Sequence, residues 1–426
     1  MKLRNLLFGT MIACAFVACS NDDDPTPNPT PDGGDGKTYV EVNAKSIETK
    51  ANADATISSL TLIVADNDGK IEAIASDASK DKGKGDLSRK VAVTPGRKKV
   101  VMLANVTVNA GFVGKSLTDL AAETNSIASE TDGNLSMNSV VYDIDVVANV
   151  TNYLGYDKAN DGNNYIDKAP TDGVKLYRNV AKVVLSKISV ADVLGEDNTH
   201  YPNAALDVKQ VYIANAKDKT SILPSDFTEW GETQVSSSFN WLAGVTTTAE
   251  SSDDVKFKVE EVSDATDSYA ESYSGKVINA KGENEFDKSF YVYENNSEND
   301  VKTDAKTLLV IKGDFSYETA EKDESGNQVR TTMPNRYYTI AIGRTGFENG
   351  FSLPTDFGAL RGGADGINGA TAGHAFDVLR NLQYNISLTV KGIGYKTPGG
   401  KGDSQMLDVQ VQVVPFGYVN QDVTIE

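Results

Sequence analysis

Short runs of apolar and β-branched residues, each bounded by turn residues, recur along most of the chain. Ile57–Val64 and Val140–Val146 are two of the clearest. The same kind of run recurs at residues 99–104, 180–185, 255–259, 290–293, 308–311, 337–342 and 386–390. Many short strands with turns between them predict an all-β fold built as β-sandwiches.

Two local signals refine this pattern. Asp68-Gly69 lies between the apolar runs 57–64 and 71–74, and an Asp-Gly pair in this position predicts a hairpin. The aspartates of this turn do not form a calcium loop, because the later ligands are not at EF-hand spacing. One short helix is predicted over Leu117–Glu123, with Ser116 as its N-cap.

The start of the chain has the layout of a secretory signal. Lys2 and Arg4 precede an apolar stretch that is too short to span a bilayer as a helix. This stretch ends in Phe16-Val17-Ala18-Cys19, which resembles a bacterial lipobox. Residues 1–19 are therefore interpreted as a lipoprotein signal peptide, with Cys19 as the lipid attachment site. An ordinary signal peptide with an incidental cysteine is the alternative. Prolines at alternate positions then predict an extended leash.

Strict alternation of apolar and polar residues stands out near both ends of the chain. Near the start, Val40, Val42 and Ala44 alternate with polar residues. Near the end, the alternating apolar positions are Leu407, Val409, Val411 and Val413. Each pattern predicts a half-buried strand, and an ordinary sandwich strand is the simplest interpretation of either one alone.

The composition excludes several classes of protein. Cysteine occurs only at positions 14 and 19, so no disulfide and no thiol chemistry remain once a signal is removed. The two histidines, His200 and His374, lie far apart in sequence and have no cysteine partners, so no metal site is predicted. A formal net charge of −19 argues against nucleic acid and anionic membranes as partners.

Motifs of catalysis are missing from the sequence. It contains no phosphate-binding glycine loop, no HExxH and no GxSxG elbow. The glycine-rich stretch 362–369 lacks a strand–loop–helix frame, so it is interpreted as a loop. Sixty Asp and Glu residues make any single carboxylate pair unspecific as an acid–base site. We therefore predict that the chain is not an enzyme and has neither a catalytic residue nor a cofactor.

A series of short phrases in a fixed order carries a family resemblance. The phrases are Lys99–Asn105, Val113–Leu117, Arg178–Val183, Phe290–Asn295, Leu379–Ile386 and Leu407–Phe416. The series resembles the fimbrillins of Bacteroidales, the subunits of type V pili, and extends from the signal to the last residues. The resemblance implies two transthyretin-like β-sandwich domains in tandem and a structural pilus subunit, most simply of the stalk. Many members carry tryptophan where this chain has Phe416.

The resemblance also implies a route of maturation. Family precursors reach the outer membrane as lipoproteins, and a trypsin-like protease then removes the leader with the first strand. A strand from another subunit fills the groove that remains. Applied to this chain, cleavage falls between Lys50 and Ala51, with Lys45 or Lys37 as alternative sites. The mature protein would be a cell-surface fimbria that supports adhesion, and its partners would be other copies of itself and related pilus subunits.

These interpretations divide the chain into four parts. Residues 1–19 are the signal, and residues 20–50 hold the leash and the removable leader strand. Residues 51–200 are expected to form the N-terminal sandwich with its acceptor groove. Residues 201–426 are expected to form the C-terminal sandwich with the donor segment 406–426. The turn-rich stretch 195–203 suggests this boundary.

Three alternatives remain open at this stage. A surface lipoprotein that binds glycans for polysaccharide uptake is compatible with the 18 tyrosines, although only Trp230 and Trp241 could add tryptophan platforms. A secreted hydrolase lacks a visible nucleophile or metal constellation. Within the pilin interpretation, Val419, Val423 and Ile425 of the final segment are a second candidate for the donor strand, and a tip or anchor role is not excluded.

Overall fold

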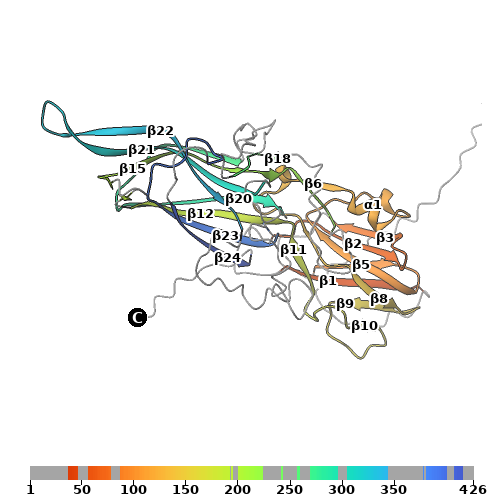
Figure 1. Cartoon of the computed structure of the whole chain (residues 1–426). Coiled ribbons are helices and arrows are strands. Elements are labelled where there is room, and N and C mark those ends of the chain that lie inside the picture. Colours follow the sequence, from red (N-terminus) through yellow and green to blue (C-terminus); the bar gives the residue numbers. More distant parts are fainter. Residues whose placement is uncertain are drawn as a thin grey trace, which may run out of the picture.

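The computed structural model describes residues 37–46, 56–77, 87–191, 193–194, 200–223, 241–242, 257–259, 269–295, 305–343, 378, 380–400 and 407–415 (Figure 1). Strands dominate these residues, which confirms the all-β prediction. The predicted helix is present as α1 (Leu117–Ala121) and is capped by Ser116. The Ser116 hydroxyl accepts from the amide of Asp119, and the Asp119 carboxylate accepts from the amide of Ser116, which completes a capping box.

Ten strands from the first part of the chain form one sheet. Its hydrogen-bonded order is β10-β9-β1-β11-β7-β5-β2-β3, with β4 paired to β1 and β8 paired to β5. The bounds are β1 (Tyr39–Ser46), β2 (Leu60–Asp66), β3 (Ile71–Asp77), β4 (Leu87–Ala92), β5 (Gly96–Ala104), β7 (Met137–Asn138), β8 (Tyr142–Val146), β9 (Thr151–Leu154), β10 (Asn164–Ile166) and β11 (Val174–Arg178). The predicted Asp-Gly hairpin is confirmed as β2–β3, and Gly69 takes the positive φ (84°) that its turn requires.

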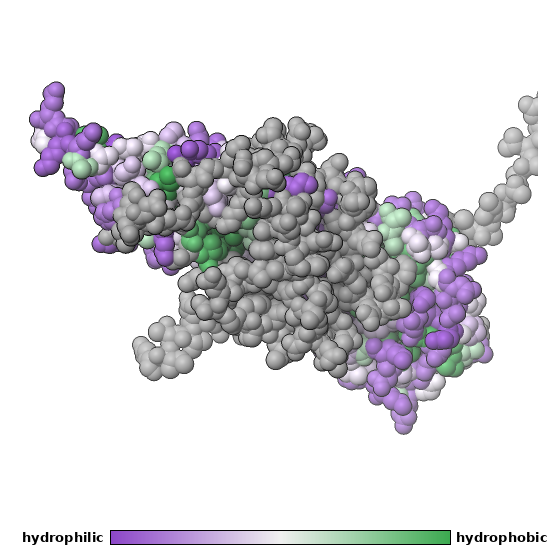
Figure 2. Space-filling view, in the orientation of Figure 1, coloured by the Kyte–Doolittle hydropathy of each residue, from purple (hydrophilic) through white to green (hydrophobic). Residues whose placement is uncertain are grey.

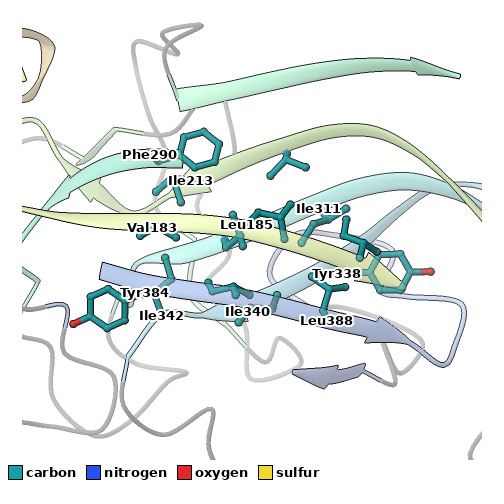
Figure 3. Packing of buried hydrophobic residues seen from close by; sticks show 14 of the residues in the cluster. Val183, Leu185, Ile213, Phe290, Ile311, Tyr338, Ile340, Ile342, Tyr384 and Leu388 are labelled. Carbon is teal, nitrogen blue, oxygen red and sulfur yellow. The ribbon is translucent and has the colours of Figure 1, made fainter. Parts of the chain in front are cut away.

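Two four-stranded sheets come from the rest of the chain, in the orders β20-β12-β23-β24 and β19-β15-β21-β22. Their bounds are β12 (Val180–Val190), β15 (Ala205–Ala214), β19 (Ala270–Asn279), β20 (Glu283–Tyr293), β21 (Leu308–Lys322), β22 (Gln328–Ala341), β23 (Leu382–Val390) and β24 (Leu407–Pro415). One apolar cluster joins the two sheets into a sandwich, with Val183, Leu185 and Leu388 from one sheet against Ile213 and Ile311 from the other (Figure 3).

The β21–β22 hairpin reaches beyond this sandwich, at the opposite end of the molecule from the ten-stranded sheet (Figure 1). Its outer part, residues 319–336, is largely exposed. The hairpin end of the molecule is mainly hydrophilic in Figure 2.

Strand β12 bears on the division into domains. It precedes the boundary expected at residues 195–203, yet both of its partners, β20 and β23, follow that boundary. A division just before Val180 therefore fits the sheets better than one near residue 200. The exact domain limits stay a prediction.

A short segment from the second half of the chain is built into the first. Strand β17 (Lys219–Ser221) pairs with β6 (Thr124–Ser126), and the next two residues, Ile222 and Leu223, are buried in the apolar cluster beside α1. The side-chain amide of Asn138 donates to the carbonyl of Ile222 at 3.0 Å. The two halves are therefore joined by backbone pairing and by apolar packing, as well as by the chain itself.

Two Arg-Asn pairs form a buried polar junction where β12 and β23 begin. The Arg178 backbone amide donates to Asn381 Oδ1 at 3.2 Å, and the Arg380 guanidinium donates to Asn179 Oδ1 at 3.2 Å. Glu294, at the end of β20, accepts from the Arg380 amide at 3.1 Å and lies 3.8 Å from its Nε. All five side chains are at most 5% exposed.

The remaining described elements are short. Two further two-stranded sheets pair β13 (Val193–Leu194) with β14 (His200–Tyr201), and β16 (Ala216–Lys217) with β18 (Trp241–Leu242). Two 3-10 turns, η2 (Ala110–Phe112) and η3 (Ile127–Ser129), lie on either side of α1 in the sequence. These elements connect the larger sheets and do not change the architecture.

Candidate functional site

Strand β1 lies in the interior of the ten-stranded sheet and is hydrogen-bonded along both of its edges. Along one edge, residues 39–44 pair antiparallel with β4. Along the other edge, residues 39–42 pair parallel with β9, and residues 44–46 pair parallel with β11. Among the described residues, β4 has no strand partner other than β1. Removing β1 would therefore leave unpaired backbone groups on three strands.

The inner face of β1 belongs to the core, as the alternation predicted. Val40 and Val42 are fully buried and Ala44 is 5% exposed. They lie in one apolar cluster with residues from β2, β5, β8, β9 and β11, including Leu62, Met102, Ile144, Leu154 and Leu176. Burial of the two valines contributes roughly 3–6 kcal/mol. A groove without β1 would expose the same apolar surface to water.

The outer face of β1 makes polar contacts with its neighbours. The Tyr156 hydroxyl donates to Glu41 Oε1 at 2.9 Å, and Lys90 Nζ lies 3.9 Å from Glu41 Oε2. The same ammonium group lies 4.7 Å from the centre of the Tyr39 ring, within the range of a cation–π contact. Burial, with the negative charge of Glu41 beside it, raises the pKa of the Tyr156 hydroxyl. Tyr156 therefore stays neutral and acts as a donor to the carboxylate.

The first residue of β1 is fixed by loops around β9. The Tyr39 amide donates to the carbonyl of Val150 at 3.2 Å, and the Asn152 side chain donates to the carbonyl of Tyr39 at 3.0 Å. The Thr38 hydroxyl accepts from the amide of Asn149 at 3.0 Å. These bonds set where a strand in this position begins.

Gly155 lets the backbone of β1 approach closely. Its φ is +82°, and a Cβ at this position would lie 2.6 Å from the carbonyl oxygen of Asn43. The same atom would lie 3.0 Å from the amide nitrogen of Val174, at the start of β11. Any residue with a side chain would therefore push β1 away from its neighbours.

Tyrosines cover the sheet next to this site. The Tyr153 ring stacks on Tyr165 and meets Tyr156 edge-on, with ring centroids 5.0 Å apart in both pairs. The Tyr165 hydroxyl donates to Asp161 at 2.8 Å, and burial together with this bond raises the pKa of Tyr165 to about 12. Because these rings pack on one another, their first role is to stabilise β9 and β10 by aromatic packing.

The second predicted strand, β24, lies at the edge of its sheet. All nine of its residues are in register with β23, from Leu407 opposite Val390 to Pro415 opposite Leu382. Leu407 and Val409 are partly buried against the cluster of the sandwich. The backbones of Val411 and Val413 follow the same register, and their side chains lie outside the described residues. In this structure β24 completes its own sandwich, as the simplest interpretation of the alternation predicted.

The other predicted site residues lie outside the described part of the chain. These are the lipid attachment site Cys19 and the cleavage site Lys50–Ala51. In the described ranges, no group of three His, Cys, Asp or Glu residues is arranged to hold a metal ion. Nor does any helix within those ranges have the length and apolar character needed to span a membrane.

Sequence reasoning missed the residues that surround β1. Tyr156 and Gly155 were not singled out, because they follow β9, a parallel partner of β1 that lies more than 100 residues further along the chain. Lys90 was missed because β4, the antiparallel partner that carries it, was not predicted as a strand. The positive φ and close approach of Gly155 become visible only in three dimensions.

Comparisons with known proteins point to one group. Residues 38–181 match the family model described as "Major fimbrial subunit protein (FimA)". No curated protein matches the chain. Among solved structures, a putative cell adhesion protein from Parabacteroides distasonis ATCC 8503 is 25% identical, with a TM-score of 0.64, and the match covers 89% of this chain and 99% of that one. A fimbrilin (fimA) from Porphyromonas gingivalis W83 is 21% identical, with a TM-score of 0.57, covering 91% and 99%.

The structural matches extend over most of the chain, whereas the family model matches residues 38–181. A second putative cell adhesion protein from Parabacteroides distasonis is 20% identical, with a TM-score of 0.59, covering 91% and 98% of the two chains. The family-model match ends at residue 181, where β11 has ended and β12 begins. The matched family and these neighbours are fimbrial or adhesion proteins and not enzymes.

Proposed function

We propose that this chain, whose residues 38–181 match the family model of a major fimbrial subunit, is a structural subunit, most simply of the stalk, of a cell-surface fimbria. It is exported as a lipoprotein and cut by a trypsin-like protease. It then polymerises with copies of itself and related subunits by donor-strand complementation, and the polymer supports adhesion. One observation carries the proposal. A single strand at the start of the chain, β1, closes a sheet whose other strands all come later in the sequence.

The physics of the groove supports assembly through this strand. Without β1, one edge of β4 and the facing edges of β9 and β11 lose their hydrogen-bond partners, and the cluster around Leu62 and Met102 loses its cover. An extended strand from another chain can restore both the hydrogen bonds and the apolar contacts, which is β-augmentation. Four aliphatic side chains would contribute roughly 1.5–3 kcal/mol each before the entropy of ordering is subtracted.

The position of β24 suits a donor. As an edge strand it is hydrogen-bonded to β23 and to no other described strand, so its release breaks the hydrogen bonds to one neighbouring strand only. Its nine residues are long enough to span the eight positions of β1. The precursor keeps its groove filled with its own first strand, which prevents assembly until the protease has acted.

A first prediction concerns the lipid. Changing Cys19→Ala should abolish acylation and leave the precursor unanchored, because the thiol is the only group that the lipobox offers to the lipid. Incorporation of a fatty-acid analogue in growing cells measures this. Cys14→Ala is the matched control and should label normally. Label retained in the Cys19→Ala chain would contradict the lipoprotein assignment.

A second prediction concerns maturation and tests the proposed function as a whole. Subunits in assembled polymer should begin at Ala51. Treatment of the precursor with trypsin-like protease should yield SDS-resistant polymers, which appear as ladders of bands on a gel. Lys45 lies within the paired backbone of β1, and a cut after Lys37 would leave β1 in place. Lys50→Gln should therefore block both the new N-terminus and the ladders.

N-terminal sequencing and gel electrophoresis are the measurements. Polymer whose subunits start at Cys19 would contradict the removal of β1. Absence of ladders, combined with retention of the chain on a polysaccharide gel, would favour the glycan-binding alternative instead.

A further inference from the structure

We propose that Lys90 and Tyr156 set the register of the incoming strand by binding Asp408 of a second copy in the place that Glu41 occupies in the precursor. This inference rests on the proposed function, because it presumes that β24 of another subunit enters the groove of β1. It adds which residues recognise that strand, and in which direction and register the strand lies.

The side chains around Glu41 bind its carboxylate with a hydrogen-bond donor and a positive charge. Tyr156 donates to it at 2.9 Å, and Lys90 supplies a positive charge 3.9 Å away. Lys90 is also the residue directly opposite Glu41 in the β1–β4 ladder. Removal of β1 would leave a hydroxyl donor and a cation side by side at the rim of an apolar groove. An incoming strand with a carboxylate at this position would satisfy both.

The two strands carry their charges in matching places. β1 reads YVEVNAKS and β24 reads LDVQVQVVP, and each contains one carboxylate, directly after an apolar residue. If β24 runs in the direction of β1 with Leu407 at the place of Val40, then Asp408 replaces Glu41 and Gln410 replaces Asn43. A carboxylate then replaces a carboxylate and an amide replaces an amide along the outer face.

Two other registers also keep the apolar face inward, but they do not place a carboxylate at Glu41 and an amide at Asn43 together. A shift of two residues places Gln410 at Glu41 and brings apolar Val414 to the outward position of Lys45. A reversed strand places Gln412 at Glu41 and Asp408 at Lys45. All three registers bring a valine to the place of Ala44, so the apolar face does not distinguish them. The outer face does, through the residue that lies opposite Lys90.

Cysteine cross-linking tests the register directly. The cut at Lys50 removes both native cysteines, so the mature chain offers no competing thiol. In the full chain, Lys175→Cys is combined in turn with Gln412→Cys, Val414→Cys or Asp408→Cys, because Lys175 pairs with Lys45 in the β1–β11 ladder and the three registers bring these three residues to the place of Lys45. Neighbouring strands lie about 4.7–4.9 Å apart, so the Cα atoms of directly paired residues are within the range of a disulfide, and Lys90 stays in place in every variant. The three donor positions share one face of β24 and differ only in register.

After protease treatment and mild oxidation, we expect the Gln412→Cys combination to give disulfide-linked ladders, at least about fivefold more than either other combination. Dominant cross-linking through Val414→Cys or Asp408→Cys would overturn the proposed register while leaving donor-strand assembly intact. Ladders without any cross-link would show that another segment, such as residues 416–426, is the donor. No ladders in the unmodified chain would overturn the proposed function itself.

Charge reversal gives an independent check. Lys90→Glu should slow ladder formation by up to about fivefold, since like charges directly opposite on neighbouring strands repel. Adding Asp408→Lys should restore the rate, whereas adding Gln412→Lys should not. Thermal melting of each precursor shows that the variants fold. Equal rescue by both lysines would contradict the specific pairing of Lys90 with Asp408.

Discussion

Gly155→Ala is expected to destabilise the precursor by about 2–5 kcal/mol and to prevent ladder formation. The added Cβ would lie 2.6 Å from the carbonyl oxygen of Asn43 and 3.0 Å from the amide of Val174. These neighbours are backbone atoms of β1 and β11, which cannot turn aside as a side chain could. The positive φ of +82° adds about 1–2 kcal/mol of conformational strain, and the forced displacement of β1 adds about 1–3 kcal/mol.

Gly162→Ala is the matched control. Gly162 has the same φ of +82°, and a Cβ at that position would meet no atom within 4 Å. Its substitution should therefore cost only the conformational strain. Urea denaturation of both precursors measures the difference, which reports the close approach of the backbones of β1 and β11 to Gly155. Equal destabilisation of the two variants would mean that β1 does not depend on Gly155 for its place.

The Gly155→Ala substitution also distinguishes two stages of assembly, which are the folding and cleavage of the precursor and the entry of the donor strand. If an incoming strand takes the place of β1, it must pass Gly155 at the same distance. A Gly155→Ala chain that is folded at low temperature and cut by the protease should then form no ladders, while the Gly162→Ala chain forms them. Normal ladders from Gly155→Ala subunits would place the incoming strand elsewhere.

The sequence was informative where a pattern is local. Alternation with a period of two predicted that Val40, Val42 and Ala44 face the core, and all three are buried. The Asp-Gly turn predicted the β2–β3 hairpin, and Ser116 predicted the start of α1. Each of these signals lies within a few residues of the structure that it specifies, so one sequence is enough to read it.

Contacts between distant segments could not be predicted in this way. The alternation of β1 shows that the strand is half-buried, but nothing in it names β9 and β11 as parallel neighbours. The phrases around Arg178, Glu294 and Arg380 were noticed only for their order along the chain. Their meeting in one buried junction depends on β12 lying between β20 and β23, which no local pattern encodes.

The junction has a mechanical meaning under the proposed function. In a polymer joined through the groove of β1, a pull would pass from the first sheet to the strands of the second sandwich within each subunit. The β6–β17 pairing, the burial of Ile222 and Leu223, and the Arg-Asn bonds all lie across that path. A separation of the two halves would have to break these contacts.

Glu294→Ala is expected to destabilise the chain by about 3–5 kcal/mol. Glu294 is 2% exposed, accepts from the Arg380 amide at 3.1 Å and lies 3.8 Å from Arg380 Nε. Its loss would leave the charge of Arg380, itself 3% exposed, without its carboxylate in the interior. Removing one partner of a buried ion pair is costly because the remaining charge stays desolvated.

Glu283→Ala at the other end of β20 is the matched control for this prediction. Its carboxylate pairs with Lys187 at 2.9 Å, but the two side chains are 64% and 41% exposed. Water screens such a pair, so its loss should cost at most about 1 kcal/mol. Urea denaturation, followed by fluorescence, compares the two variants. A Glu294→Ala chain as stable as Glu283→Ala would mean that the remaining hydrogen bonds of Arg380, including the one to Asn179, hold the junction without the carboxylate.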